Sequence, residues 1–205
     1  MTGQVAFARA LCTGIVLSLT LVQLSQADTQ TVVLAEQDFQ DGQIINGPQG
    51  SVRAFNDASI GEPPPFDRNR GSDLGGGTFD ASWTFNCKPR DVSNAQITFG
   101  ISDCDSGATG SQLASFVVDG VDLTAILDQQ FEERACSNIQ YAVFIVDLPG
   151  DARAELGDGI ATFSLRLKGP THGFPYATNS GGLDFSSLVV VGMPRKSGGF
   201  VLVVR

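Results

Sequence analysis

The chain is poor in the residues and motifs that most often mark enzymes. It has one histidine and four cysteines among 205 residues. It contains no Cys-x-x-Cys, His-Glu-x-x-His, Gly-x-Ser-x-Gly or P-loop sequence. These absences argue against a thiolate zinc site, a dithiol redox centre, a zinc protease of the common type and a nucleophile-elbow hydrolase.

Positive charge is also scarce. The chain has 13 lysines and arginines and 22 aspartates and glutamates, so its formal net charge is −9. An acidic surface argues against nucleic acid or an anionic membrane as a partner, because both carry negative charge themselves. The acidity is compatible with cation binding and with simple solubility.

The one apolar run near the start is too short for a typical membrane span of about 20 residues. It covers Ala10–Leu24, follows the basic Arg9, and precedes Ser25-Gln26-Ala27, which places small residues at the −3 and −1 positions of a cleavage site. We expect residues 1–27 to be a secretory signal peptide, with Asp28 as the new N-terminus, rather than an uncleaved anchor. The expected location is extracellular or in the cell envelope, with no transmembrane segment after cleavage.

Export makes a disulfide plausible, and three cysteines follow the predicted cleavage site: Cys87, Cys104 and Cys136. Three is an odd number, so at most one intrachain bridge forms and one thiol is left over. The sequence alone does not select the pair.

Alternating apolar and polar residues predict short β-strands along the whole chain. The clearest is Thr78–Phe85, where Phe79, Ala81, Trp83 and Phe85 share one face and place the only tryptophan in the core. The other predicted strands are Thr31–Ala35, Ser51–Phe55, Ala95–Ile101, Leu113–Val118, Val121–Leu127, Ile139–Leu148, Ile160–Leu167 and Leu183–Val191.

Asp119-Gly120 predicts a two-residue hairpin turn, because both residues readily take positive φ. The arm after it, Val121–Leu127, also carries leucine and isoleucine at helical spacing, so its end is either strand or helix. Gln129–Arg134 is polar and expected to be exposed, whereas the apolar Ile139–Leu148 is expected to be a central strand. Pro149–Asp158 has room for one short helical turn.

Many short strands with glycine-rich turns and no long amphipathic helix predict an all-β protein. Two long loops, Gly61–Gly77 and Gly169–Gly182, favour crossovers between two sheets over an up-and-down meander. We therefore expect one antiparallel, jelly-roll-like β-sandwich domain over residues 28–192, with a short C-terminal tail over 193–205.

Several segments resemble a group of bacterial secreted β-sandwich proteins that often carry a C-terminal PEP-CTERM sorting tail. They are FDASWTF, FIVDLP, DGIATFSLRLKGP, NSGGLDFSSLVV and the stretch from Ile97 to Leu127. Similar members read Asp-His-Asp-Ser where this chain has Asp103-Cys104-Asp105-Ser106. The resemblance implies a secreted sandwich and no particular catalytic role. A sorting tail of that kind is not expected here, because this sequence has no Pro-Glu-Pro motif and its final apolar run is too short to cross a bilayer.

The loop after the strand Ala95–Ile101 is the best candidate for a metal site. Asp103, Asp105 and Gly107 form Asp-x-Asp-x-Gly, in which alternate oxygen ligands around a tight turn can bind Ca²⁺. The third acid of an EF-hand loop is missing, and plain turn formation by Asp and Gly is the alternative. Asp184 is a candidate further ligand from a distant segment.

A second candidate site lies in the two long loops. Phe66, Phe174 and Tyr176 are the aromatic side chains expected to be exposed there, and Arg68 adds hydrogen-bond donors. Flat rings stack on sugar rings, which would make these loops a ligand-binding site for extracellular polysaccharide or matrix. The alternative is that loop aromatics pack under their own loop.

These features predict a secreted or envelope-associated, non-enzymatic sandwich that is structural or binds carbohydrate weakly. The rival hypothesis is an extracellular hydrolase of polysaccharide, which requires two carboxylates across a groove. No pair is marked by spacing, and Glu132, Glu133 and Glu155 lie in polar segments. The lone His172, in a loop, is expected to be solvent-exposed.

Overall fold

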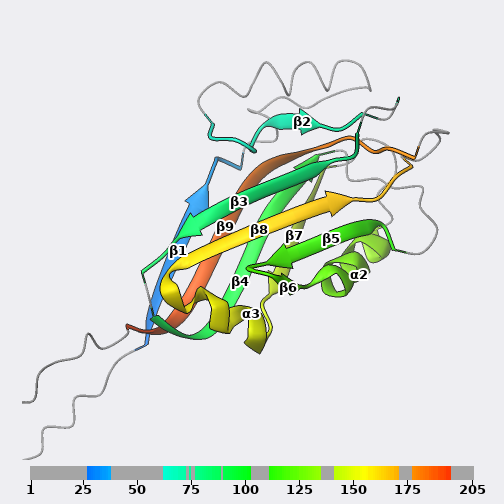
Figure 1. Cartoon of the computed structure of the whole chain (residues 1–205). Helices are drawn as coiled ribbons and strands as arrows, with labels where there is room; N and C mark the ends of the chain where they lie inside the picture. Colours follow the sequence, from blue (N-terminus) through cyan, green and yellow to red (C-terminus); the bar gives the residue numbers. More distant parts are fainter. Residues whose placement is uncertain are drawn as a thin grey trace, which may run out of the picture.

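A computed structural model defines the fold, and it describes residues 27–37, 62–72, 74, 77–88, 90–102, 111–134, 141–170 and 177–194. These residues form a single all-β domain made of two antiparallel sheets packed face to face, with two short α-helices at one side (Figure 1). The predicted fold class is confirmed.

The larger sheet has the strand order β1-β9-β4-β7, with β2 also paired to β9, and the smaller has the order β3-β8-β5-β6. The strands are β1 (Asp28–Leu34), β2 (Arg68–Arg70), β3 (Asp80–Asn86), β4 (Arg90–Ser102), β5 (Leu113–Val118), β6 (Val121–Asp122), β7 (Tyr141–Asp147), β8 (Ile160–Leu167) and β9 (Gly181–Pro194).

The connections define a jelly roll. If the three-residue β2 is left out and the other eight described strands are ranked 1 to 8 along the chain, so that β3 is second and β9 is eighth, the two sheets have the orders 1-8-3-6 and 2-7-4-5. Every connection between consecutive strands therefore crosses from one sheet to the other, except the β5–β6 hairpin. This is the double Greek-key arrangement of a jelly roll, and it agrees with the expectation that long connections mark crossovers.

Alternation located most strands well. β8 has the predicted bounds, and β3 buries Ala81, Trp83 and Phe85 while exposing the residues between them. β4 and β9 are longer than predicted, since pairing with neighbours on both sides extends them beyond their apolar centres. β9 continues to Pro194, two residues into the predicted tail.

The hairpin is confirmed, and the question of its second arm is decided in favour of a helix. Asp119 and Gly120 both have positive φ, 46° and 86°. β6 lasts two residues, and α2 (Thr124–Arg134) then begins, with the Asp122 carboxylate accepting a hydrogen bond from Thr124 N at 2.9 Å. The helix buries Leu127 against the sandwich.

Two expectations about this region are wrong. Gln129–Arg134 is the second half of α2, where Gln129 and Glu132 are exposed as expected, but Phe131 is fully buried because it lies four residues after Leu127 on the same helix face. β7 is an edge strand, although its sequence is the most apolar in the domain. The Gln130 side chain covers that edge by donating to Ile145 O at 2.7 Å, which protects a strand edge that could otherwise pair with another chain.

The segment after β7 contains the predicted helical turn. It forms α3 (Gly150–Glu155) and then the 3-10 turn η1 (Leu156–Asp158), and Gly159 follows with a φ of 92°. At the same end of the sandwich, the buried Arg90 donates to Asp28 O at 3.2 Å and to Gln30 Oε1 at 2.7 Å. Arg90 therefore ties the start of β1 to the start of β4.

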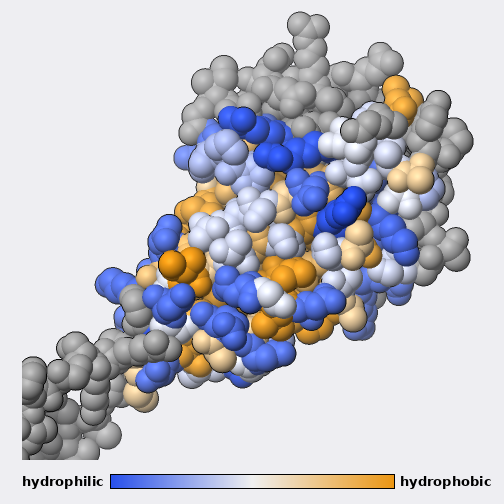
Figure 2. All heavy atoms as spheres, in the orientation of Figure 1, coloured by the Kyte–Doolittle hydropathy of each residue, from blue (hydrophilic) through white to orange (hydrophobic). Residues whose placement is uncertain are grey.

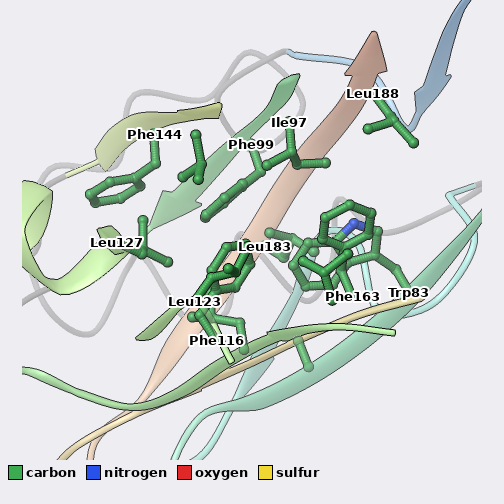
Figure 3. Packing of buried hydrophobic residues seen from close by; sticks show 14 of the residues in the cluster. Trp83, Ile97, Phe99, Phe116, Leu123, Leu127, Phe144, Phe163, Leu183 and Leu188 are labelled. Carbon is green, nitrogen blue, oxygen red and sulfur yellow. The ribbon is translucent and has the colours of Figure 1, made fainter. Parts of the chain in front are cut away.

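A continuous series of aromatic rings fills the space between the sheets (Figure 3). Trp83 stacks on Phe163 with centroids 5.8 Å apart, and Trp83 contacts Phe99 of the opposite sheet at 5.9 Å. Phe99 then stacks on Phe144 at 5.7 Å, and Phe144 stacks on Phe131 at 4.2 Å. The core thus includes both sheets and α2.

The only tryptophan also makes a polar contact between the sheets. Its indole Nε1 donates to Ser186 Oγ at 3.1 Å in the buried interior. A buried indole N–H needs an acceptor, and Ser186 on β9 supplies one that the alternation pattern of β3 did not predict.

Phe131→Ala is expected to lower the free energy of unfolding by about 3–5 kcal/mol, because it removes a fully buried ring and leaves a cavity beside Phe144. Ile126→Ala, on the exposed face of the same helix, is the matched control and should cost less than about 1 kcal/mol. Urea unfolding followed by circular dichroism measures both. Equal losses would contradict the placement of Phe131.

Asp119 generates a prediction about pH. Burial raises the pKa of its carboxyl above the ordinary value, opposed by the hydrogen bond from Thr162 N and reinforced by Asp158 and Glu155. A raised folded-state pKa means that the folded protein disfavours the charged form. This penalty is present above that pKa and disappears as the pH falls and the carboxyl is protonated.

Asp119→Asn keeps the acceptor oxygen and tolerates positive φ, so it should unfold at a higher temperature than the natural chain at pH 7. The difference should shrink toward zero near about pH 3, where Asp119 is protonated. Thermal melts across that range provide the measurement. A difference that does not vary with pH would show that the Asp119 charge is not penalised in the fold.

Candidate functional site

The described ends of the three loops singled out by the sequence lie at one end of the sandwich. The loop that contains Asp103 and Asp105, which we call the acidic loop, follows Ser102, and Ser102 pairs with both Tyr141 and Gly182. On the other side of this loop, the backbone O of Gln112 accepts a hydrogen bond from Lys168 N at 2.9 Å. The first long loop contains β2, which pairs with Gly181–Leu183 at the end of the second long loop. We call this the loop end; in Figure 1 it is where β4 and β8 finish.

The backbone of the loop end is closely packed. Asn179 O accepts a hydrogen bond from Phe79 N at 2.7 Å, and a Cβ added to Gly71 would lie 2.3 Å from that same oxygen. Gly71 also has a φ of 81°, so a glycine is required there on two grounds. On the other side, Asp128 of α2 accepts hydrogen bonds from Gln112 N and Leu113 N, at 2.6 and 3.0 Å. These contacts hold the starts and ends of the loops in fixed positions.

The expectation that Phe66 is an exposed aromatic is wrong. Its side chain is 1% exposed and belongs to the main core cluster, next to Leu183. A ring buried this way offers no face to a sugar. The first long loop instead folds back on β9, as the alternative hypothesis held for loop aromatics.

Arg68 is exposed and lies on β2 at the loop end, whereas Arg70 is half-buried. The Arg70 Nε is buried and has no hydrogen-bond acceptor among the residues that the structure describes. The loop end therefore has guanidinium donors, as predicted for Arg68, but on a short strand rather than in an irregular loop.

Two carboxylates at the loop end are fully buried. Asp67 directly precedes Arg68, and Asp184 follows Leu183, the residue that pairs with Arg68. Tyr141 Oη donates to Asp184 Oδ2, and the tyrosine ring fits because residue 100 is glycine, whose missing Cβ would overlap it. β4 and β9 are also out of regular register here, between Phe99 and Ile101. Burying a carboxylate is unfavourable unless partners satisfy it, so this arrangement is a specific feature of the loop end.

Several predicted site residues lie outside the described residues. They are the calcium candidates Asp103 and Asp105, the ligand candidates Phe174 and Tyr176, the loop residue His172, and the cysteines Cys104 and Cys136. Among the residues that are described, no group of three or more histidine, cysteine or acidic side chains could hold a metal ion. Glu132 and Glu155 are exposed, as expected.

Cys87 is a free thiol at the opposite end of the sandwich from the loop end. Its two candidate disulfide partners, Cys104 and Cys136, lie outside the described residues. Burial raises the pKa of the Cys87 thiol, partly offset by the charge of Arg90, so the thiol stays protonated and unreactive at neutral pH.

Sequence reasoning missed Asp67, Tyr141 and Asn179 as parts of this site. Asp67 has a positive φ of 50°, and Tyr141, half-buried at the start of an apolar strand, carries no mark of its partner on another strand. The sequence did indicate Asp184 as a candidate ligand, but the contact of Asp184 with Tyr141 arises only because β4 pairs with β7 on one side and with β9 on the other.

Comparisons with known proteins identify no family. No family model matches the chain, and no curated protein matches it. Solved structures that align with it include dimeric latent PorU from Porphyromonas gingivalis, with a TM-score of 0.37 and 11% identity over 57% of this chain and 10% of that one.

The ectodomain of ANX1 from Arabidopsis thaliana and the plant receptor-like kinase FER align over 79% of this chain, at TM-scores of 0.29 and 0.28 and 12% identity. The chain spans 39% and 40% of those proteins. Scores this low support no inference about function. No helix within the described ranges is long and apolar enough to cross a membrane.

Proposed function

We propose that the chain is a secreted or envelope-associated, non-enzymatic β-sandwich whose loop end binds extracellular carbohydrate. The observation that carries this proposal is the convergence of the three loops at one end of a jelly roll whose interior is filled by side chains. Jelly rolls include lectin domains. Binding by loops held on a rigid sandwich needs no catalytic group.

The donors available at the loop end are compatible with sugar hydroxyls. Arg68 is exposed on β2, and the second long loop, which contains the aromatic candidates Phe174 and Tyr176, is anchored directly beside it by the pairing of β2 with Gly181–Leu183. In the proposal the two aromatic residues stack on sugar rings and the arginine supplies hydrogen bonds.

Phe174→Ala combined with Tyr176→Ala is expected to weaken binding of the full chain to immobilised polysaccharides about tenfold or more, because each lost stacking contact contributes roughly 0.5–1.5 kcal/mol. Affinity electrophoresis over a panel of polysaccharides is the measurement. Ile160→Ala, an exposed apolar side chain at the opposite end of the sandwich, is the control and should leave binding unchanged.

Three other outcomes separate the alternatives. Binding that survives the double substitution would move the site away from the second loop, and no binding to any polysaccharide would refute the proposal. Release of reducing ends during incubation would favour the rival hydrolase, which needs a carboxylate pair across a groove.

A structural Ca²⁺ at Asp103 and Asp105 is a second proposal, and one observation favours it. Asp184 is fully buried and lies two residues from Gly182, which pairs with Ser102, the residue that leads into the acidic loop. A bound cation would stabilise the folded state by an amount that grows with the logarithm of the cation concentration relative to its dissociation constant.

Adding EDTA is therefore expected to lower the melting temperature of the natural chain by about 5 °C or more. The shift should vanish in Asp103→Ala combined with Asp105→Ala, and should persist in Asp147→Asn, which changes an acid at the far end of β7. A natural chain that melts at one temperature with calcium and with EDTA would refute the metal site.

A further inference from the structure

Four basic residues lie at the loop end of this acidic chain. Arg68 and Arg70 are on β2, Arg166 is near the end of β8, and Lys168 directly follows that strand. Arg68, Arg166 and Lys168 are exposed. Figure 2 shows strongly hydrophilic side chains over β2 and around the end of β8, on the same side of the molecule. We call these four residues the basic face.

Hydrogen bonds connect the two halves of the basic face. Gly71, next to Arg70, packs against Asn179 O, and the Asn179 side chain donates to Lys168 O at 3.3 Å. Asn179 O also accepts from Phe79 N, one residue before Asp80, which pairs directly with Arg166. β2 and the end of β8 are therefore neighbours, although about 100 residues separate them in sequence.

Two of the described carboxylates of this region are buried. Asp67 and Asp184 have no exposed surface, so neither carboxylate reaches a ligand in solvent. Asp80, opposite Arg166, is exposed. Among the residues that the structure describes, this surface presents three exposed cations, Arg68, Arg166 and Lys168, and one exposed carboxylate, Asp80, in a chain whose formal net charge is −9. Arg70 adds a guanidinium whose Nε has no acceptor within the described part of the chain.

We propose that the basic face binds a carboxylated polysaccharide. This inference rests on the proposed carbohydrate function and narrows its ligand from sugars in general to acidic ones. The planar guanidinium group pairs with a carboxylate through two parallel hydrogen bonds. Arg68 and Arg70 are about 7 Å apart along β2, so neighbouring acidic units of one polymer can engage successive arginines.

Because the chain as a whole is acidic, a polyanion is attracted to the basic face only close to it. An acidic protein repels a polyanion at long range, so the basic face attracts one only at short range, within roughly a Debye length of about 10 Å. Binding is therefore sensitive to salt and to the removal of these particular charges. Nucleic acid is also a polyanion, and its phosphates form bidentate hydrogen bonds with arginine too, so duplex DNA is one of the polymers compared in the experiment.

The experiment uses the full chain with alginate as the polyuronate, dextran as the neutral polymer, and dextran sulfate and duplex DNA as other polyanions. Alginate is expected to bind tightest, and raising the salt from about 50 to 500 mM should weaken it about tenfold or more. Arg68→Gln combined with Arg166→Gln should weaken it by about tenfold again. The control, Lys88→Gln, removes an exposed charge at the opposite end of the sandwich and should change little.

Each remaining result decides against the inference. Preference for dextran, for dextran sulfate or for DNA over alginate would overturn the carboxylate assignment. An equal loss with Lys88→Gln would show a general charge effect. If the double variant does not fold, Arg166→Gln alone decides, because its side chain projects from an intact strand. Binding to neutral polymers only would refute this inference and leave the proposed function standing, whereas no binding to any polysaccharide refutes both.

Discussion

The packing of aromatic rings between the two sheets is the interaction on which the rest of the structure depends. Phe99 lies at its centre, because it contacts Trp83 across the sandwich, Phe116 of the smaller sheet and Phe144 beside it in its own sheet. Phe131 extends the series into α2. Interiors packed this closely tolerate little change in volume, so the relative position of the two sheets depends on these rings.

The loop end is the functional consequence of that packing. β4 and β9 make the most extensive pairing in the domain, and both finish or start where the acidic loop leaves. β2 is a strand of only three residues, yet it brings the first long loop onto β9 and places Arg68 beside the base of the second. The half-buried Tyr141 donates a hydrogen bond to the buried Asp184 at this same end. A rigid sandwich with converging loops suits recognition, since its loops can vary while the scaffold stays unchanged.

Much of the fold could be predicted from alternation, and the failures have physical causes. β8 was placed residue by residue, and the Asp119-Gly120 turn was correct because both residues favour positive φ. Phe131 was missed because a single apolar residue among polar ones gives no period, although it completes a helical face with Leu127. β7 was taken for a central strand, since an edge covered by Gln130 can be as apolar as an interior strand.

The sequence by itself determined the all-β class, the strand positions, the hairpin and the three loops, because period-two alternation and turn residues act over a few neighbours. Only the tertiary structure decided that the described ends of the three loops share one end of the sandwich, that Phe66 is buried, and that β2 pairs with β9. Those facts depend on pairing between strands far apart in the chain, such as β2 with β9, and no local pattern of residues encodes such contacts.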